Sequence, residues 1–379
     1  MQTYRISPLD LLFFRDGRPL DVDKSRDDHR NIGHGDFWPR PDHLYNAVMH
    51  ALVGSRIAGE RASYGKFGGL RTTGPFPLLK NPDGTETLFL PRPLDWDCVP
   101  EPLPKGKTDA PEFLEWGFVD RTPGKKSYPA WIPLADYHRY LAGDPLPPLS
   151  HESLFMTETR VGNTLDSATG ASRRVQDQRH SGQYEAQYLR LRQGVSMWGE
   201  ATSGTEGTSF PSVLHMGGQG FLVYFDRDDS LPSIECVLPA PKAKDSLGPF
   251  FVRWTLLAPA LFARTGWLPG WCRDTGKDET TRKPEGTVMF PDCAGASLVA
   301  ACTGKPIVFS GYDTVDGVKD TQLAVPAGSC YVFRCETREA AKSLVARLHL
   351  QRQSDFGSQG FGIGVCSFVE YPDREAANT

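Results

Sequence analysis

The order of apolar segments in the second half of the chain constrains the fold more than any other feature of the sequence. Strand-length runs of aromatic and aliphatic residues alternate there with two segments of helical character. The predicted strands are residues 250–259, 306–312, 329–336 and 365–371, and the predicted helices are residues 291–302 and 337–350. This order, β-α-β-β-α-β, is that of the ferredoxin-like fold, which RNA-recognition modules share.

The second predicted helix carries the strongest local signals. Thr337 stands where an N-cap is expected, and Glu339 follows in the first turn. Four apolar residues then share one helical face, namely Ala341, Leu344, Val345 and Leu348. This helix should pack against the predicted sheet.

The first half of the chain predicts a longer version of the same arrangement. A strand is expected within residues 3–14, a helix within residues 41–59 with Asp42 as its N-cap, and a closing strand within residues 218–226. A long insertion rich in Pro and Trp lies between the helix and the closing strand.

Length and composition agree with two soluble domains. The chain has 379 residues, of which 39% are hydrophobic and 23% are charged. With residues 238–249 as a linker, we expect an α+β protein of tandem ferredoxin-like (RRM-like) domains. The N-terminal domain would span residues 1–237 and the C-terminal domain residues 249–379.

A glycine-rich segment separates the second predicted helix from the last strand. Its glycines are Gly357, Gly360, Gly362 and Gly364. Phosphate-binding loops of nucleotide enzymes follow a strand and open a helix, whereas this segment leaves a helix, enters a strand and contains no lysine. Two interpretations stay open: a flexible connection whose glycines permit positive φ, or a main-chain surface that approaches RNA or another chain. Four glycines exceed what a helix cap requires, which favours the second.

A glycine-rich loop in this position resembles the RAMP superfamily, the RNA-binding proteins of CRISPR effector complexes. Further segments agree in order along the chain: PLDLLFFRDGRPL, ETRVGN, MGGQGFLVYF, LLAPALFARTGWLP and VPAGSCYVF. Together they look like the handle-binding subunit of the type III-B, or Cmr, complex, its third-numbered subunit. The matching segments run from residue 9 to residue 369.

The resemblance implies a role in antiviral defence. Subunits of this kind hold the 5′ handle of the guide RNA beside the large palm-domain subunit and the backbone RAMP subunits. They are not known as catalysts, so the resemblance implies a non-catalytic, RNA-binding component of a ribonucleoprotein.

The arginines between residues 160 and 192 are the main candidate RNA contacts. They are Arg160, Arg173, Arg174, Arg179, Arg190 and Arg192. With three acids and no lysine, the segment has a formal charge of +3 within a chain of net charge −4. It predicts a hairpin with arms near residues 153–161 and 184–192, and alternation should place Arg190 and Arg192 on one face. Arginine binds phosphates and stacks on bases, but the alternative is a solvated loop whose arginines pair with nearby acids.

Two N-terminal segments supply the remaining candidates. Arg15 and Arg18 flank an Asp-Gly turn after the first predicted strand, where the resemblance favours contact with RNA or a subunit. Trp38 and Arg40 precede the first predicted helix and offer a base stack and a phosphate contact. Core packing is the stronger interpretation of Trp38, because it stands beside prolines.

The sequence contains no recognisable catalytic motif or metal-ligand spacing, so no cofactor is expected. The eight cysteines form no C-x-x-C pair, and no segment has the length of a membrane span. We therefore expect reduced thiols and a cytoplasmic location. Two alternatives remain, a metal-independent endoribonuclease that processes guide RNA precursors, with His349 as a possible base, and a nucleotide-using enzyme.

Overall fold

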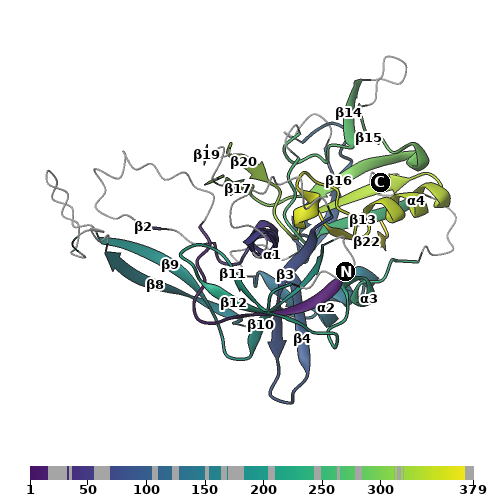
Figure 1. Cartoon of the computed structure of the whole chain (residues 1–379). Coiled ribbons are helices and arrows are strands. Elements are labelled where there is room, and N and C mark those ends of the chain that lie inside the picture. Colours follow the sequence, from purple (N-terminus) through teal and green to yellow (C-terminus); the bar gives the residue numbers. More distant parts are fainter. Residues whose placement is uncertain are drawn as a thin grey trace. The chain divides into compact units, whose positions relative to one another are not determined.

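The chain forms two compact units, and each is assembled from three separate segments (Figure 1). Unit 1 contains Met1–Glu86, Ser153–Asp229 and Val308–Gln322, and unit 2 contains Thr87–Glu152, Ser230–Ile307 and Leu323–Thr379. The single boundary expected between residues 237 and 249 therefore differs from this division. The computed structural model describes residues 1–15, 32–33, 36–54, 69–104, 110–121, 128–149, 153–163, 169, 183–203, 210–242, 249–262, 265–277, 284–310, 312–313, 317–318 and 320–371.

Unit 1 is built on an antiparallel sheet in which strands follow one another as β11-β12-β1-β10-β3. They are β1 (Gln2–Pro8), β3 (Arg71–Lys80), β10 (Val195–Thr202), β11 (Val213–His215) and β12 (Leu222–Arg227). Numbered by their order along the chain, β1, β3, β10 and β12 are the first to fourth strands of this sheet, with β11 left aside. They lie side by side in the order fourth, first, third, second. This is the ferredoxin-like arrangement predicted for the first half.

Helix α1 (Pro41–Gly54) covers one face of this sheet. Alternation along β1 turns Tyr4 and Ile6 toward that face, where they join Leu44 of the helix in one core. Pro41 is the first helical residue, because its fixed φ and its missing N–H are tolerated at that position. Asp42 therefore lies in the first turn, and its expected place as N-cap is wrong.

A second, smaller sheet of unit 1 contains the predicted hairpin. Strands β8 (Phe155–Asn163) and β9 (Gln183–Leu191) pair antiparallel, and β2 (Ile32–Gly33) pairs parallel with β9. Two very short strands, β18 (Tyr312–Asp313) and β19 (Gly317–Val318), form a separate pair. Two further short strands are β17 (Ile307–Phe309) and β20 (Gln322–Ala324).

Unit 2 is built on a larger sheet in which the strands lie in the order β14-β15-β16-β21-β13-β22. Strand β6 pairs with β16, and β5 pairs with β6. These strands are β5 (Cys98–Pro102), β6 (Trp116–Asp120), β13 (Phe250–Leu256), β14 (Cys272–Lys277), β15 (Pro284–Val288), β16 (Ala296–Cys302), β21 (Cys330–Cys335) and β22 (Gly364–Val369). Taken along the chain, β13, β16, β21 and β22 again lie in the order fourth, first, third, second, so the predicted α+β class is confirmed.

Helix α4 (Arg338–Leu348) covers one face of this sheet, as its sequence predicts. The Thr337 hydroxyl accepts a hydrogen bond from the Ala340 N–H at 3.1 Å, so the predicted N-cap is confirmed. Leu344 and Leu348 pack with Trp254 of β13 in one core. The remaining elements are β4 (Glu86–Pro91), β7 (Trp131–Pro133), α2 (Leu134–Ala142), α3 (Ile234–Val237) and the 3₁₀ turns η3 (Pro291–Cys293) and η4 (Gly357–Gln359).

The helix expected over residues 291–302 is wrong. Only η3 is helical, and the chain turns at Gly295, whose φ is +81°. Ala296–Cys302 then forms β16, which pairs with β15 on one side and β21 on the other. The helical propensity of this alanine-rich stretch is overridden, because both of its edges satisfy sheet hydrogen bonds.

Candidate nucleic-acid interface

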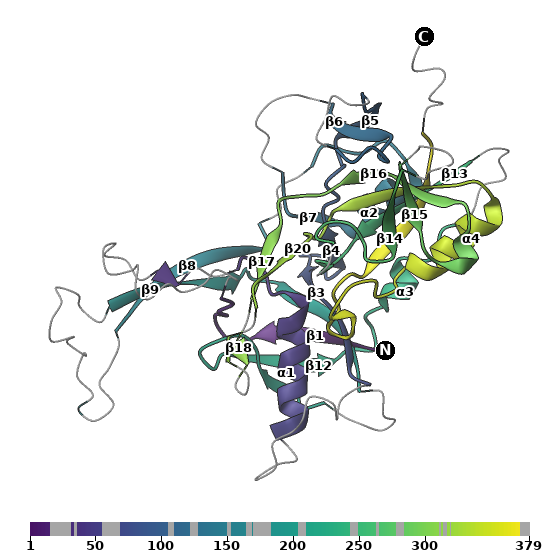
Figure 2. The same ribbon diagram turned by 90° about the horizontal axis from the view of Figure 1, so that it is seen from above.

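The two arms of the predicted arginine hairpin are strands β8 and β9 of unit 1. Their register places Glu158 opposite Tyr188 and Arg160 opposite Ala186. Figures 1 and 2 show the two strands as a long ribbon. Arg173, Arg174 and Arg179 lie in the connection between the strands, outside the described residues. Their role in RNA binding stays a prediction.

One face of this ribbon carries a network of two arginines and two acids. The carboxylate of Glu158 accepts hydrogen bonds from both arginines, from Arg160 Nε at 2.7 Å and from Arg190 Nε at 2.5 Å. The Asp10 carboxylate lies 3.3 Å from a terminal nitrogen of Arg190 and 3.9 Å from one of Arg160. These hydrogen bonds hold the pKa of Glu158 below its usual value and raise the pKa of Arg190.

The formal charges of this network cancel, since two guanidinium groups face two carboxylates. The alternative of arginines paired with nearby acids therefore describes Arg160 and Arg190 in the free chain. Both arginines nevertheless keep access to solvent, with 47% of the Arg160 side chain and 35% of the Arg190 side chain exposed. The pair is positioned by Glu158 and stays reachable from outside.

The network rests on an aromatic cluster. Leu11, Ala186 and Tyr188 are buried together, with Phe13 and Phe221 packed against them. The Tyr188 hydroxyl donates to the side-chain oxygen of Gln219 at 2.8 Å, and the Gly218 N–H donates to the Phe13 carbonyl at 2.8 Å. Three of the segments that carry the family resemblance, PLDLLFFRDGRPL, ETRVGN and MGGQGFLVYF, thus meet in unit 1.

The expected place of Arg192 on the same face as Arg190 stays a prediction. Arg192 follows the last residue of β9, and its backbone N–H donates to the Leu154 carbonyl at 3.1 Å. Its side chain is exposed. Arg15 is also exposed, and Arg18 lies outside the described residues.

Trp38 and Arg40 are both engaged within unit 1. The Trp38 indole N–H donates to the Pro75 carbonyl at 2.8 Å, and its ring packs on Phe155. Arg40 is only 9% exposed; its guanidinium lies over the Phe309 ring and within 3.4 Å of Asp36 and Asp42. The packing interpretation of Trp38 therefore fits its contacts.

The exposed ring of this segment is instead Phe37, with 69% of its surface open to solvent. The sequence does not distinguish Phe37 from Trp38, because both are aromatic residues in the same Pro-flanked loop. Residues 37 and 38 form a bend in which Trp38 is partly buried against the core of unit 1 while Phe37 stays open to solvent.

The glycine-rich segment approaches its own unit closely. Gly360, Gly362 and Gly364 are buried, and the Gly362 N–H donates to the Pro259 carbonyl at 2.8 Å. A Cβ at Gly362 would overlap Ser354, and one at Gly364 would overlap the Trp254 indole. Gly360 and Gly362 also have positive φ, of +97° and +66°. Close packing within unit 2 thus accounts for these glycines, and contact of the segment with RNA stays a prediction.

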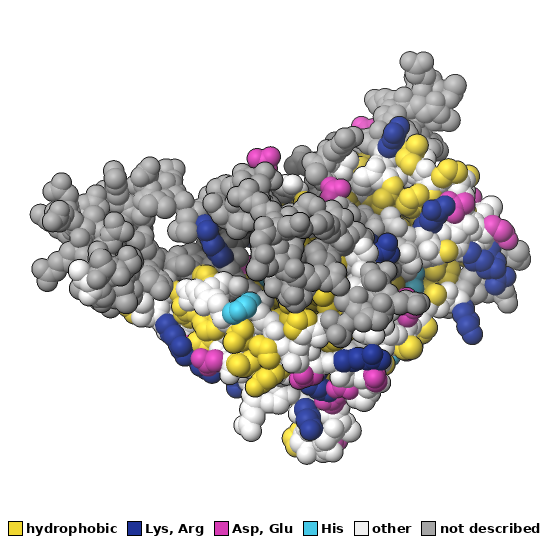
Figure 3. All heavy atoms as spheres, in the orientation of Figure 1, with side chains coloured by type: hydrophobic (Ala, Val, Ile, Leu, Met, Phe, Trp, Pro, Cys, Tyr) yellow, Lys and Arg dark blue, Asp and Glu magenta, His cyan; other side chains and the backbone are white. Residues whose placement is uncertain are grey.

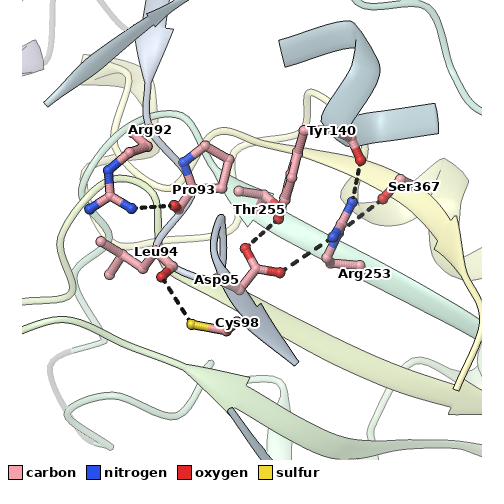
Figure 4. A network of polar contacts seen from close by, with 9 residues as sticks. All are labelled: Arg92, Pro93, Leu94, Asp95, Cys98, Tyr140, Arg253, Thr255 and Ser367. Atoms are coloured by element: carbon pink, nitrogen blue, oxygen red, sulfur yellow. Dashed lines mark hydrogen bonds and ion pairs between the residues drawn. The ribbon is translucent and has the colours of Figure 1, made fainter. Parts of the chain in front are cut away.

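The sheet face of unit 2 that lies opposite α4 is covered by the unit's own residues. Arg253 and Thr255 of β13 point to this face, where they meet Asp95 and Tyr140 from the segment Thr87–Glu152 (Figure 4). Arg253 also donates to the Ser367 hydroxyl of β22 at 3.2 Å. Thr255 is fully buried. This face is therefore closed to the stacking mode in which RNA-recognition sheets bind bases.

His349 does not have the environment of a general base. Its Nδ1 accepts the Cys366 backbone N–H at 3.1 Å, and its Nε2 lies 2.9 Å from the Leu238 carbonyl, to which it donates. The side chain is 8% exposed, and burial lowers its pKa. Both ring nitrogens hold backbone groups, so the endoribonuclease alternative gains no base here.

Three further features of the described residues concern surface charge, metal binding and membrane insertion. Figure 3 shows a face on which Lys and Arg side chains lie among Asp and Glu side chains instead of forming one continuous basic area. Among the described residues, no group of His, Cys, Asp and Glu has the arrangement of a metal site. No helix in the described ranges is both long and apolar enough to cross a bilayer.

Comparison with known families identifies the family of the chain. A family model described as "CRISPR-associated protein (Cas_Cmr3)" matches residues 4–366. The chain belongs to this family. The resemblance drawn from its motifs is thereby confirmed, and this Cmr3-family chain is a subunit of the type III-B CRISPR effector.

Solved structures with similar folds have low sequence identity to this Cmr3-family chain. One is titled "Cryo-EM structure of the Type III-B Cmr-beta bound to cognate target RNA"; it has 13% identity and a TM-score of 0.45, over 95% of each chain. Another, "Crystal structure of Csm3-Csm4 subcomplex in the type III-A CRISPR-Cas interference complex", has 10% identity and a TM-score of 0.39, over 87% of this chain and 92% of that chain. Comparison with curated proteins finds no match.

Proposed function

We propose that this chain is a non-catalytic RNA-binding subunit of the type III-B effector. It holds the 5′ handle of the guide RNA with the β8–β9 ribbon and docks on the large palm-domain subunit. The observation that carries the proposal is the pair Arg160 and Arg190, exposed on one face of the ribbon and positioned by one carboxylate of Glu158.

Arginines held in this way suit an irregular single strand. A guanidinium presents five N–H donors, so each arginine that gives its Nε–H to Glu158 keeps its terminal N–H groups for other acceptors. Holding the side chain in advance reduces the rotamer entropy lost on binding. The remaining arginines of the segment, Arg173, Arg174, Arg179 and Arg192, would extend the contact along the backbone.

The other predicted contacts fall into two groups. Arg15 and Arg18 belong to the same N-terminal segment as Asp10 and are proposed to contact RNA or a neighbouring subunit. Trp38, Arg40 and the buried glycines already have partners within their units, so they are weaker candidates. Their contribution would be to hold the surfaces that face RNA.

The test measures how a reconstituted effector binds guide RNA recovered from the native complex. Replacing Arg173, Arg174 and Arg179 together by Ala should weaken binding, and the slope of log affinity against log salt should fall by about 2, at about 0.7 per single-strand phosphate. The matched control replaces Arg71, Lys80 and Arg227, which lie on β3 and β12, by Ala. It removes the same number of positive charges. Equal effects of the two triple variants would contradict an RNA contact through the connection between β8 and β9.

Catalysis is tested separately with the purified chain and precursor RNA in EDTA. We expect the RNA to remain intact. Cleavage at a single site would overturn the non-catalytic assignment and would restore the endoribonuclease alternative.

A further inference from the structure

We propose that Asp10 occupies, in the RNA-free chain, the place of an RNA phosphate between Arg160 and Arg190, and that a phosphate of bound RNA displaces it. The inference rests on the proposed function, since it assumes that the ribbon meets RNA. It adds a regulatory role for a carboxylate that neither the motifs nor the arginine pattern assigns to the site.

The two carboxylates of the network are held differently. Glu158 takes the Nε–H of each arginine at 2.7 and 2.5 Å and lies on β8 itself. Asp10 faces terminal nitrogens of the same arginines at 3.3 and 3.9 Å. The Asp10 side chain is also more exposed, at 53% against 30% for Glu158. Glu158 is thus the fixed partner and Asp10 the loosely held one.

The charge balance of the site favours an exchange of anions. Arg160 and Arg190 with Glu158 alone carry a formal charge of +1, which Asp10 neutralises. A phosphodiester also carries one negative charge and has two free oxygens, so it can bridge two guanidinium groups as a carboxylate does. Exchange of one for the other leaves the site neutral.

The backbone around Asp10 allows its side chain to leave without unfolding. The Leu9 N–H donates to the Leu222 carbonyl at 3.1 Å, and the Leu12 N–H donates to the Leu189 carbonyl at 2.9 Å. Leu11 and Leu12 are fully buried. These contacts fix the main chain on both sides of Asp10, while the exposed carboxylate needs only a rotamer change to reach water.

Occupation by Asp10 gives the free subunit a physical advantage. Two unpaired arginines would attract any polyanion, because such attraction does not depend on sequence. A carboxylate in the phosphate position competes with any incoming polyanion and so weakens its binding. Only an RNA that makes further contacts along the ribbon displaces it. Asp10 would therefore exchange some affinity for selectivity.

The experiment compares two substitutions that change charge equally. Asp10→Asn removes the competing carboxylate, and Asp229→Asn removes an exposed carboxylate that pairs with Arg227 on another strand. In the reconstituted effector, we expect Asp10→Asn to tighten binding of native guide RNA about two- to fivefold, the range of an exposed ion pair. Asp229→Asn should change it less.

A second pair of variants shows whether the effect passes through the arginines. In a chain that carries Arg160→Ala and Arg190→Ala, adding Asp10→Asn should no longer tighten binding. Equal effects of Asp10→Asn and Asp229→Asn, or weaker binding by Asp10→Asn, would overturn the inference. If these results occur while the ribbon arginines still prove necessary for RNA binding, the proposed function stands and only the role of Asp10 fails.

Discussion

The guanidinium of Arg253 lies over the ring of Tyr140, with its central carbon 3.7 Å from the ring centroid. Arg253 also donates to the Tyr140 carbonyl at 2.7 Å and forms an ion pair with Asp95 at 3.3 Å. The Tyr140 hydroxyl donates to the other oxygen of Asp95 at 2.6 Å (Figure 4). These contacts join the segment Thr87–Glu152 to the sheet of unit 2, so they should govern its stability.

Replacing Arg253 by Ala should lower the free energy of unfolding by about 3–5 kcal/mol, because it leaves the buried Asp95 carboxylate without its cation. Tyr140→Phe should cost about 1–3 kcal/mol through the lost hydrogen bond. Urea denaturation of the purified chain measures both. The control is Arg227→Ala, which removes an exposed ion pair with Asp229 and should cost much less, because solvent screens the pair. A loss for Arg253→Ala no larger than that of the control would contradict the structural role of the network.

Gly364→Ala should destabilise unit 2 by about 1–3 kcal/mol, because the added methyl group meets the Trp254 indole and lies 2.8 Å from the Thr255 carbonyl. Gly270→Ala is the matched control, since a Cβ there meets nothing within 4 Å. Thermal unfolding should separate the two variants clearly. If they unfold alike, the close approach at Gly364 is not what requires a glycine.

The imidazole of His43 should stay neutral at pH values well below the usual pKa of a histidine. Its Nδ1 accepts the Arg40 N–H at 3.0 Å, and its surroundings lower its pKa to about 4, chiefly by desolvation. Because the folded state then binds fewer protons than the unfolded state, stability should fall as the pH drops from about 6.5 toward 4, by at most about 1.4 kcal/mol per pH unit. His349, whose pKa is also lowered, should add to this loss.

Proton NMR titration of the folded chain checks the His43 value directly. The midpoint of its ring resonance should lie near 4 and should return toward 6.5 in urea. A folded-state midpoint near 6.5 would show that the Arg40 hydrogen bond and the surrounding burial do not control this residue.

Trp38→Ala should destabilise unit 1 far more than Phe37→Ala, although the two residues are neighbours. Trp38 packs on Phe155 and donates to the Pro75 carbonyl, so its loss should cost about 2–4 kcal/mol. Phe37 is mostly exposed, and its loss should stay within about 0.5 kcal/mol. Calorimetry of the two variants distinguishes these outcomes, and a large loss for Phe37→Ala would refute the assignment of the outward ring.

Local signals predicted the elements whose residues decide their own conformation. Thr337 and the apolar face of α4 were sufficient for that helix, and alternation was sufficient for β8 and β9. The strand β16 was missed because its conformation depends on neighbours, β15 and β21, that are distant along the chain.

Only part of the candidate site could be predicted, because local patterns do not show contacts between distant segments. The arginine-rich pattern identified Arg160 and Arg190, whereas Asp10, which is far away in the sequence, enters the site only through tertiary packing. Glycine content suggested an external partner for residues 357–364. In the fold, the neighbours that require Gly362 and Gly364 are Ser354 and Trp254, and neither contact has a signature in the sequence.

The covering of the unit 2 sheet by Thr87–Glu152 has a consequence for biosynthesis. Trp116 of this segment packs on Val299 and Val332, which leave the ribosome much later. A growing chain must therefore carry Trp116 without these neighbours until residues 299 and 332 have been synthesised. A fragment that holds Trp116 but lacks β16 and β21 would leave this apolar surface exposed to water.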